Sequence, residues 1–237
     1  MEGNPPFFDS ISRMERKVPF SEGEYYHIYS RGVEKRQVFL NPGEYERFQL
    51  LLRLCNTKEP VHMANFFKRH EGFAAAQMFE YIEPGEVGRL TEIAAYALMP
   101  NHIHLIVRER EKGGISKFML KLMTAYSTYF NLKHKRSGPL FTRPFRSKHL
   151  DTDEYARWAF SYVTLNPLAL FQSDWEERGV QDISAAGAFL RTYRFASFLD
   201  YLDAPRPESI ILAKDALPLA LDMRDMDSML KILATRA

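Results

Sequence analysis

The stretch "EIAAYALMPNHIHLIVRER" (Glu92 to Arg110) decides the fold, because it predicts two apolar strands joined by a tight turn at Pro100. Residues two apart in a strand point to the same face of the sheet. His102 and His104 are therefore expected to project side by side, while Ile103 points into the core. The apolar run that follows the histidines predicts that this strand is buried.

The segments on either side of this hairpin predict further strands and helices. A β-branched and aromatic stretch comes before it, and a stretch with apolar residues at i, i+4 spacing follows it. Asp151 and Glu154 resemble the capping box that opens a helix. The expected order is strand (24–32), helix (41–57), strands (92–100 and 102–110), helix (115–135), extended segment (137–150) and helix (151–170). This order predicts an α+β fold, with one mostly antiparallel sheet of ferredoxin-like or split βαβ type flanked by helices.

Length and composition favour one globular domain with appendages. The chain has 237 residues, of which 46% are hydrophobic and 26% charged. We expect an N-terminal arm (1–22), a main domain (23–171) and a C-terminal helical extension (172–237). No apolar run approaches the length of a membrane span, and the N-terminus lacks the apolar segment of a secretory signal. The single Cys55 excludes a Cys-rich zinc module and predicts a reducing, cytoplasmic setting.

The charge is distributed unevenly along the chain. The overall net charge is only +2, but residues 108–148 hold 11 basic and two acidic side chains, a net +9. The segments before and after this block carry −2 and −5. Such an asymmetry is typical of a surface that meets a polyanion, although a solvated basic helix face would give the same pattern.

Two imidazoles on one face of a sheet can bind a divalent cation and leave coordination positions open for substrate oxygens. This is the metal hypothesis for His102 and His104. The alternative is a pair of ordinary strand histidines, since no further ligand lies next to them in the sequence. His27, at the centre of the first expected strand, is a candidate to line the same surface, or else a hydrogen-bonded strand histidine.

A second constellation lies in "FSYVTLNPL" (Phe160 to Leu168). On a helix, Tyr162 and Asn166 are i and i+4 and share one face. An asparagine oxygen is a hard ligand that could complete a magnesium or manganese site, and a tyrosine beside it could attack a phosphodiester. The alternative is that Tyr162 packs in the core and Asn166 only ends the helix before Pro167.

Four motifs together resemble a known family. "YYHIYSRG", "ALMPNHIHLIV", "RSGPLFTRPFRSKHL" and "FSYVTLNPL" occur in the order found in the REP-associated tyrosine transposases, which belong to the HUH superfamily of single-strand DNA transposases. The resemblance covers roughly residues 20–170. It implies a central antiparallel sheet flanked by helices, and a protein that acts as a monomer or homodimer.

The resemblance also implies the roles of the site residues. His102, His104 and Asn166 would bind Mg²⁺ or Mn²⁺, and Tyr162 would be the nucleophile. The implied reaction cuts single-stranded DNA beside hairpins, forms a 5′-phosphotyrosine with a free 3′-OH, and rejoins strands by the reverse transesterification. Tyr126 and Tyr129 are rival nucleophiles, but neither has Asn or Gln at i+4. The rival functions are a non-catalytic nucleic-acid-binding module and a metal-dependent hydrolase of small phosphate esters.

Basic side chains would hold the phosphates of the DNA without selecting its sequence. Phe141 and Phe145 could stack on unpaired bases or belong to the core. Gly32 would permit close approach of the backbone. The expected DNA contacts are Arg31, Lys35, Arg36, Arg110, Lys117, Lys121, Lys133, Lys135, Arg136, Arg143, Arg146 and Lys148.

Overall fold

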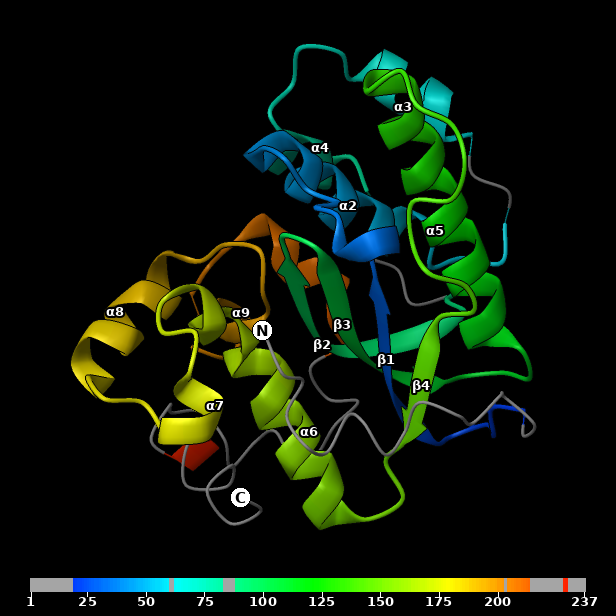
Figure 1. Ribbon diagram of the computed structural model, residues 1–237. Helices are drawn as coiled ribbons and strands as arrows, with labels where there is room; N and C mark the ends of the chain where they lie inside the picture. The colour runs from blue at the N-terminus through cyan, green and yellow to red at the C-terminus, as the bar shows by residue number, and fades with distance from the viewer. Residues whose placement is uncertain (1–18, 60–61, 83–87, 203, 214–227, 230–237) are drawn as a thin grey trace.

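A four-stranded antiparallel sheet forms the centre of the molecule in the computed structural model (Figure 1). The structure describes residues 19–59, 62–82, 88–202, 204–213 and 228–229. The strands are β1 (Tyr25–Arg31), β2 (Thr91–Met99), β3 (His102–Glu109) and β4 (Arg146–His149). They lie in the order β2-β3-β1-β4, and each neighbouring pair is antiparallel.

Helices fill the connections and the C-terminal part of the chain. The longer ones are α2 (Pro42–Leu54), α5 (Gly114–Lys133), α6 (Asp153–Leu165) and α8 (Ile183–Thr192). The shorter α-helices are α3 (Met63–Arg69), α4 (Ala75–Glu80), α7 (Trp175–Arg178) and α9 (Phe198–Tyr201). Three 3₁₀ turns are η1 (Val33–Lys35), η2 (Asn166–Leu170) and η3 (Pro207–Ile211). No helix of the described residues is long and apolar enough to cross a membrane.

The topology is that of two interleaved split βαβ units. The connection β1–α2–β2 leaves a gap that β3 fills, and the connection β3–α5–β4 leaves a gap that β1 fills. This is the strand order of a ferredoxin-like sheet, so the α+β fold predicted from the sequence is confirmed.

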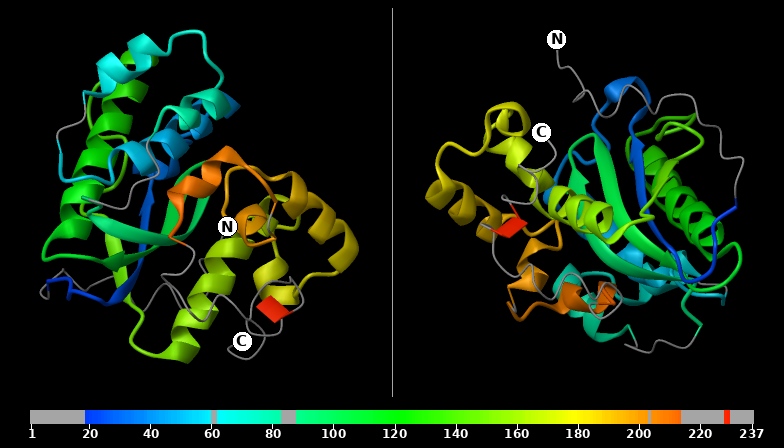
Figure 2. Two further views of the ribbon diagram at one scale, coloured as in Figure 1. Left: turned by 180° about the vertical axis from the view of Figure 1, so that it is seen from behind. Right: turned by 90° about the horizontal axis from the view of Figure 1, so that it is seen from below.

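The two faces of the sheet are covered by different helices. Ile103 and Leu105 are fully buried on the face where α2 and α5 pack against each other through the rings of Phe48 and Tyr126, whose centroids are 4.9 Å apart. Helix α6 packs on β2 and β3 from the other side (Figure 2, right). Because strand residues alternate, His102 and His104 point to the α6 face.

The end of β3 fixes the start of α5. Both carboxylate oxygens of the buried Glu109 accept hydrogen bonds from backbone N–H groups, those of Gly113 at 2.6 Å and Ile115 at 2.7 Å. These bonds satisfy donors that would otherwise have no partner in the first turn of the helix. A Cβ at Gly114 would lie 2.2 Å from the carbonyl oxygen of Leu90, which directly precedes β2, so the helix can approach this segment so closely only with glycine there.

The start of α6 differs from the prediction. Thr152 is the N-cap, and its hydroxyl accepts a hydrogen bond from the Tyr155 N–H at 3.1 Å, so the capping box expected at Asp151 is wrong by one residue. Both residues are common N-caps, and the sequence gives two adjacent candidates. The helix itself lies where the sequence predicted it, and it ends at Leu165.

The C-terminal extension packs onto the free edge of β2. The Leu98 N–H donates to the Phe195 carbonyl oxygen at 2.9 Å, and Ala97 and Ala196 form an isolated bridge. The Tyr201 hydroxyl donates to the Ala94 carbonyl oxygen. These contacts cover an edge that would otherwise present unpaired backbone groups. The expected arm (1–22) falls mostly outside the described residues.

Candidate active site

The two histidines stand on β3 where the prediction placed them. Their ring centroids are 5.0 Å apart, and His104 is only 4% exposed. Arg31 and Tyr29 of β1 lie directly opposite His102 and His104, respectively. Since paired residues in an antiparallel sheet share a face, all four side chains point toward α6.

Hydrogen bonds orient both imidazoles. The Nδ1 atom of His102 lies 2.6 Å from Oδ1 of Asn101, in the turn that opens the strand. An amide oxygen only accepts, so this Nδ1 carries the proton and the Nε2 of His102 keeps its lone pair. The Nδ1 atom of His104 lies 2.8 Å from Nε2 of His27, which is 3% exposed. Hydrogen-bonded partners of this kind fix the ring orientation of metal-binding histidines.

Burial keeps these imidazoles neutral. It lowers the pKa of His27 to about 4. It also lowers the pKa of His102 to about 4, with a further decrease from the Arg31 guanidinium and a smaller opposing effect of Asn166. The pKa of His104 is lowered well below its usual value, first by burial and then by the two neighbouring imidazoles. Neutral imidazoles are the form that binds metal ions.

Helix α6 brings the second half of the constellation to the histidines. The ring centroid of Tyr162 lies 5.6 Å from that of His104, and Trp158 stacks on Tyr162 at 5.2 Å with an interplanar angle of 5°. Asn166 follows the last residue of the helix and is only 3% exposed. Although the helix ends at Leu165, the Asn166 side chain remains next to His102 and Tyr162.

The donor set fits a divalent cation. The Oδ1 atom of Asn166 is buried and has no hydrogen-bond partner in the described part of the chain, an arrangement that is costly unless the oxygen has another ligand. It lies beside His102, and the combination of two imidazoles with an amide oxygen suits Mg²⁺ or Mn²⁺. No three His, Cys, Asp or Glu side chains of the described residues form a metal-binding group.

The hydroxyl of Tyr162 has a partner that the sequence did not indicate. It forms a hydrogen bond with the carboxylate of Glu176 on α7. Burial and the negative charge of Glu176 raise the pKa of Tyr162 well above its usual value, whereas the hydrogen bond with Asn166 lowers it. The phenol is therefore protonated at neutral pH, and the Glu176 carboxylate is positioned to accept its proton. Burial also raises the pKa of Glu176.

The rival tyrosines lie elsewhere. The Tyr126 hydroxyl donates to the Val38 carbonyl oxygen at 2.6 Å inside the core, and Tyr129 stands on the same helix α5, across the sheet from the histidines. Tyr29, for which the sequence predicts no role, lies on the same face as the histidines with its ring centroid 6.0 Å from that of His104. Its register opposite His104 is a long-range pairing that no local pattern predicts.

The basic block divides into two groups. Arg146 and Lys148 of the edge strand β4 pair with Tyr29 and His27, so they share the site face with Arg31. The Arg31 Nε is buried and has no hydrogen-bond partner among the described residues. These three cations border the histidines and are placed to hold a phosphate backbone near them.

The other expected DNA contacts lie away from this face or already have partners. Lys121 donates to the backbone oxygens of Thr57 and Glu59, and Lys133 pairs with Glu44 at 2.9 Å. Carboxylate partners at 3.5–3.9 Å also engage Arg36, Arg110 and Lys117. Arg136 donates to the amide oxygen of Asn131 at 2.5 Å and to the Pro139 carbonyl oxygen at 3.3 Å. Lys35 and Lys135 are exposed.

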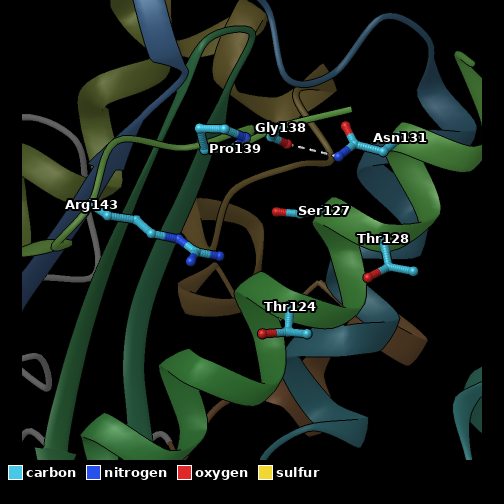
Figure 3. A pocket seen from close by; sticks show the side chains of 7 residues that line it. All are labelled: Thr124, Ser127, Thr128, Asn131, Gly138, Pro139 and Arg143. Carbon is cyan, nitrogen blue, oxygen red and sulfur yellow. Dashed lines mark hydrogen bonds between the residues drawn. The ribbon is translucent and has the colours of Figure 1, made fainter. Parts of the chain in front are cut away.

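A separate pocket of about 440 Å³ lies between α5 and the segment that follows it (Figure 3). Arg143 points across it toward the hydroxyl groups of the helix. Its walls contain no carboxylate and are formed by Thr124, Ser127, Thr128, Asn131, Gly138, Pro139 and Arg143. Next to it, Phe141 is 3% exposed and belongs to the core, which is one of the two alternatives that the sequence left open, while Phe145 is partly buried against Phe20.

The split βαβ sheet thus presents a His-x-His pair to a tyrosine and an asparagine at the end of the overlying helix α6. Residues 65–165 match the model of the family "Transposase IS200 like". This segment contains both histidines and Tyr162, so the transposase resemblance expected from the sequence is confirmed.

A solved structure of a REP-associated tyrosine transposase bound to a REP hairpin is similar at 11% sequence identity and a TM-score of 0.46. The alignment covers 81% of this chain and 86% of that chain. A search of curated proteins found no match.

Proposed function

We propose that this protein is a metal-dependent tyrosine transposase that cleaves and rejoins single-stranded or hairpin DNA through a 5′-phosphotyrosine intermediate. The observation that carries the proposal is the meeting of Tyr162 and Asn166 with His102 and His104, although some sixty residues separate the two pairs in the sequence. The transposase family match over residues 65–165 supports the same reaction class.

The chemistry assigned to Tyr162 is a transesterification. Its Oη attacks the phosphorus of a phosphodiester, the bond from phosphorus to the 3′ oxygen breaks, and that oxygen leaves and takes up a proton. Glu176 accepts the phenolic proton through the hydrogen bond that already joins the two groups. Attack by the free 3′-OH on the phosphotyrosine reverses the reaction, so no external energy source is needed.

Three groups of this chain would hold the divalent cation, namely the Nε2 atoms of His102 and His104 and the Oδ1 atom of Asn166. When bound, Mg²⁺ or Mn²⁺ supplies positive charge that polarises the scissile phosphate. The Arg31 guanidinium opposite His102 lies where it can bind another oxygen of the same phosphate. Arg146 and Lys148 extend this positive border along the edge strand, toward the rest of the DNA strand.

The test is the formation of a covalent protein–DNA adduct. The full chain is incubated with Mn²⁺ and a 3′-labelled pool of hairpin oligonucleotides that carry randomised single-stranded flanks, and the products are separated on a denaturing gel. We expect a labelled adduct that disappears with chelator and in Tyr162→Phe. An undiminished adduct in Tyr162→Phe would contradict the assignment of the nucleophile.

The adduct gel, together with a salt-dependent binding assay and a chromogenic ester assay, separates the alternatives. A non-catalytic nucleic-acid-binding module would retain the oligonucleotides in a salt-sensitive way without forming an adduct under any metal condition. A hydrolase of small phosphate esters would turn over a chromogenic ester without a protein–DNA linkage. The unpartnered Asn166 oxygen and the Tyr162–Glu176 hydrogen bond favour the transferase over both.

A further inference from the structure

His27 is the third imidazole of the site face, and the proposed chemistry does not use it. It stands in the middle of β1, is 3% exposed, and its ring centroid lies 5.1 Å from that of His104. Its Nε2 is 2.8 Å from the Nδ1 of His104. A buried polar group of this kind needs a partner, and this contact provides one.

The contact is with the side of the His104 ring that carries Nδ1. The Nε2 on the other side of that ring remains for a ligand. Among the described residues no three His, Cys, Asp or Glu side chains are arranged around one metal position, so His27 does not complete a three-histidine set with His102 and His104. The geometry thus makes His27 a partner of a metal ligand rather than a ligand.

The consequence lies in the position of one proton. A neutral imidazole has one N–H donor and one acceptor nitrogen. The Nε2 of His104 can bind a cation only if the proton of this ring is on Nδ1, and that proton then needs an acceptor. The Nε2 lone pair of His27 is within hydrogen-bond distance of it. Asn101 Oδ1 accepts the corresponding proton of His102, so each of the two imidazoles has its own acceptor.

We propose that His27 is a positioning residue that accepts the hydrogen bond of the His104 Nδ1–H and thereby presents the His104 Nε2 to the divalent cation. This inference rests on the proposed function in that it takes His104 as a metal ligand. It does not depend on DNA cleavage, and it is tested without DNA.

The first measurement is the affinity of the metal-free protein for Mn²⁺, from titration followed by electron paramagnetic resonance. His27→Leu removes the acceptor, and we expect roughly a 10- to 100-fold weaker affinity. His27→Gln keeps an acceptor oxygen at similar reach and should bind within about threefold of the wild type, as rescue by a conservative variant requires. His149→Leu, on the exposed edge strand β4, is the matched control and should leave the affinity unchanged.

The second measurement is the protonation pattern of the histidine rings, from nitrogen–proton correlation NMR of the Zn²⁺-loaded wild-type protein. We expect a proton on Nδ1 and metal coordination at Nε2 for His104, and no coordination at either nitrogen of His27. Coordination at a His27 nitrogen, or wild-type affinity in His27→Leu, would overturn the proposal. If His27→Leu does not fold, the NMR spectrum of the wild-type protein still tests the proposal.

The proposed function and the proposed role of His27 can be refuted independently. A missing protein–DNA adduct together with the expected NMR pattern would remove the proposed function and leave the role of His27 intact. An adduct on Tyr162 together with metal coordination by His27 would support the proposed function and refute the proposed role of His27.

Discussion

Replacing His27 by glutamine should change how the stability of the protein depends on pH. In the folded protein, burial lowers the pKa of His27 to about 4, whereas an unfolded chain has a histidine pKa near 6.5. Above pH 6.5 both states are neutral and the full stability is present. As the pH falls from 6.5 toward 4, His27 binds a proton in the unfolded state but stays neutral in the folded state, so the free energy of unfolding decreases.

The expected size follows from these two values. Between pH 7 and pH 4.5, His27 alone should reduce the free energy of unfolding by about 2 kcal/mol, since one pKa unit corresponds to about 1.4 kcal/mol. Glutamine does not titrate, so His27→Gln loses this contribution. The difference in stability between the two proteins should therefore shift by about 2 kcal/mol in favour of the variant on acidification.

The assay is urea unfolding at both pH values with a chelator present, followed by tryptophan fluorescence and circular dichroism. His62→Gln, at an exposed position, is the control and should follow the wild type at both pH values. Parallel pH dependence of the wild type and His27→Gln would refute the reasoning, because it would mean that His27 is solvated or charged in the folded state.

Three further predictions concern the hydroxyl, the carboxylate and the guanidinium groups. Tyr162→Phe should form no adduct, whereas Tyr126→Phe should form it normally, as the adduct gel will show. Tyr126→Phe should also lose roughly 1–2 kcal/mol of stability in urea unfolding, because the Val38 carbonyl loses its hydrogen-bond donor. Glu176→Gln should slow adduct formation about 100-fold and Glu177→Gln should not, as a single-turnover time course will show. Arg143→Ala should reduce the salt dependence of single-strand binding by about 0.7 in the log–log slope, measured by fluorescence anisotropy, and a slope unchanged from the wild type would place the pocket off the DNA path.

Much of the site could be predicted because its spacing is local. The two-residue period of a strand places His102 and His104 on one face, and the helical period places Tyr162 and Asn166 within one turn. The order of strands and helices also predicted the ferredoxin-like, mostly antiparallel sheet. Pro167 made the direction of the Asn166 side chain hard to foresee, since the helix ends just before it.

The remaining parts depend on contacts between distant segments. Glu176 comes from a helix of four residues, too short for a periodic pattern, and it reaches Tyr162 only through tertiary packing. The pairing of Arg31 with His102 is a matter of strand register, which the whole sheet sets. Phe141 alternates with basic residues as a base-stacking residue would, but a core position gives the same alternation.

Identification of the residue that carries the DNA tests the proposed mechanism most directly. The adduct is digested with protease and nuclease, and the peptides are sequenced by tandem mass spectrometry. We expect a nucleotide on Tyr162, attached through a 5′ phosphate. A nucleotide on Tyr29, which shares the same face of the sheet, or on any other residue would contradict it.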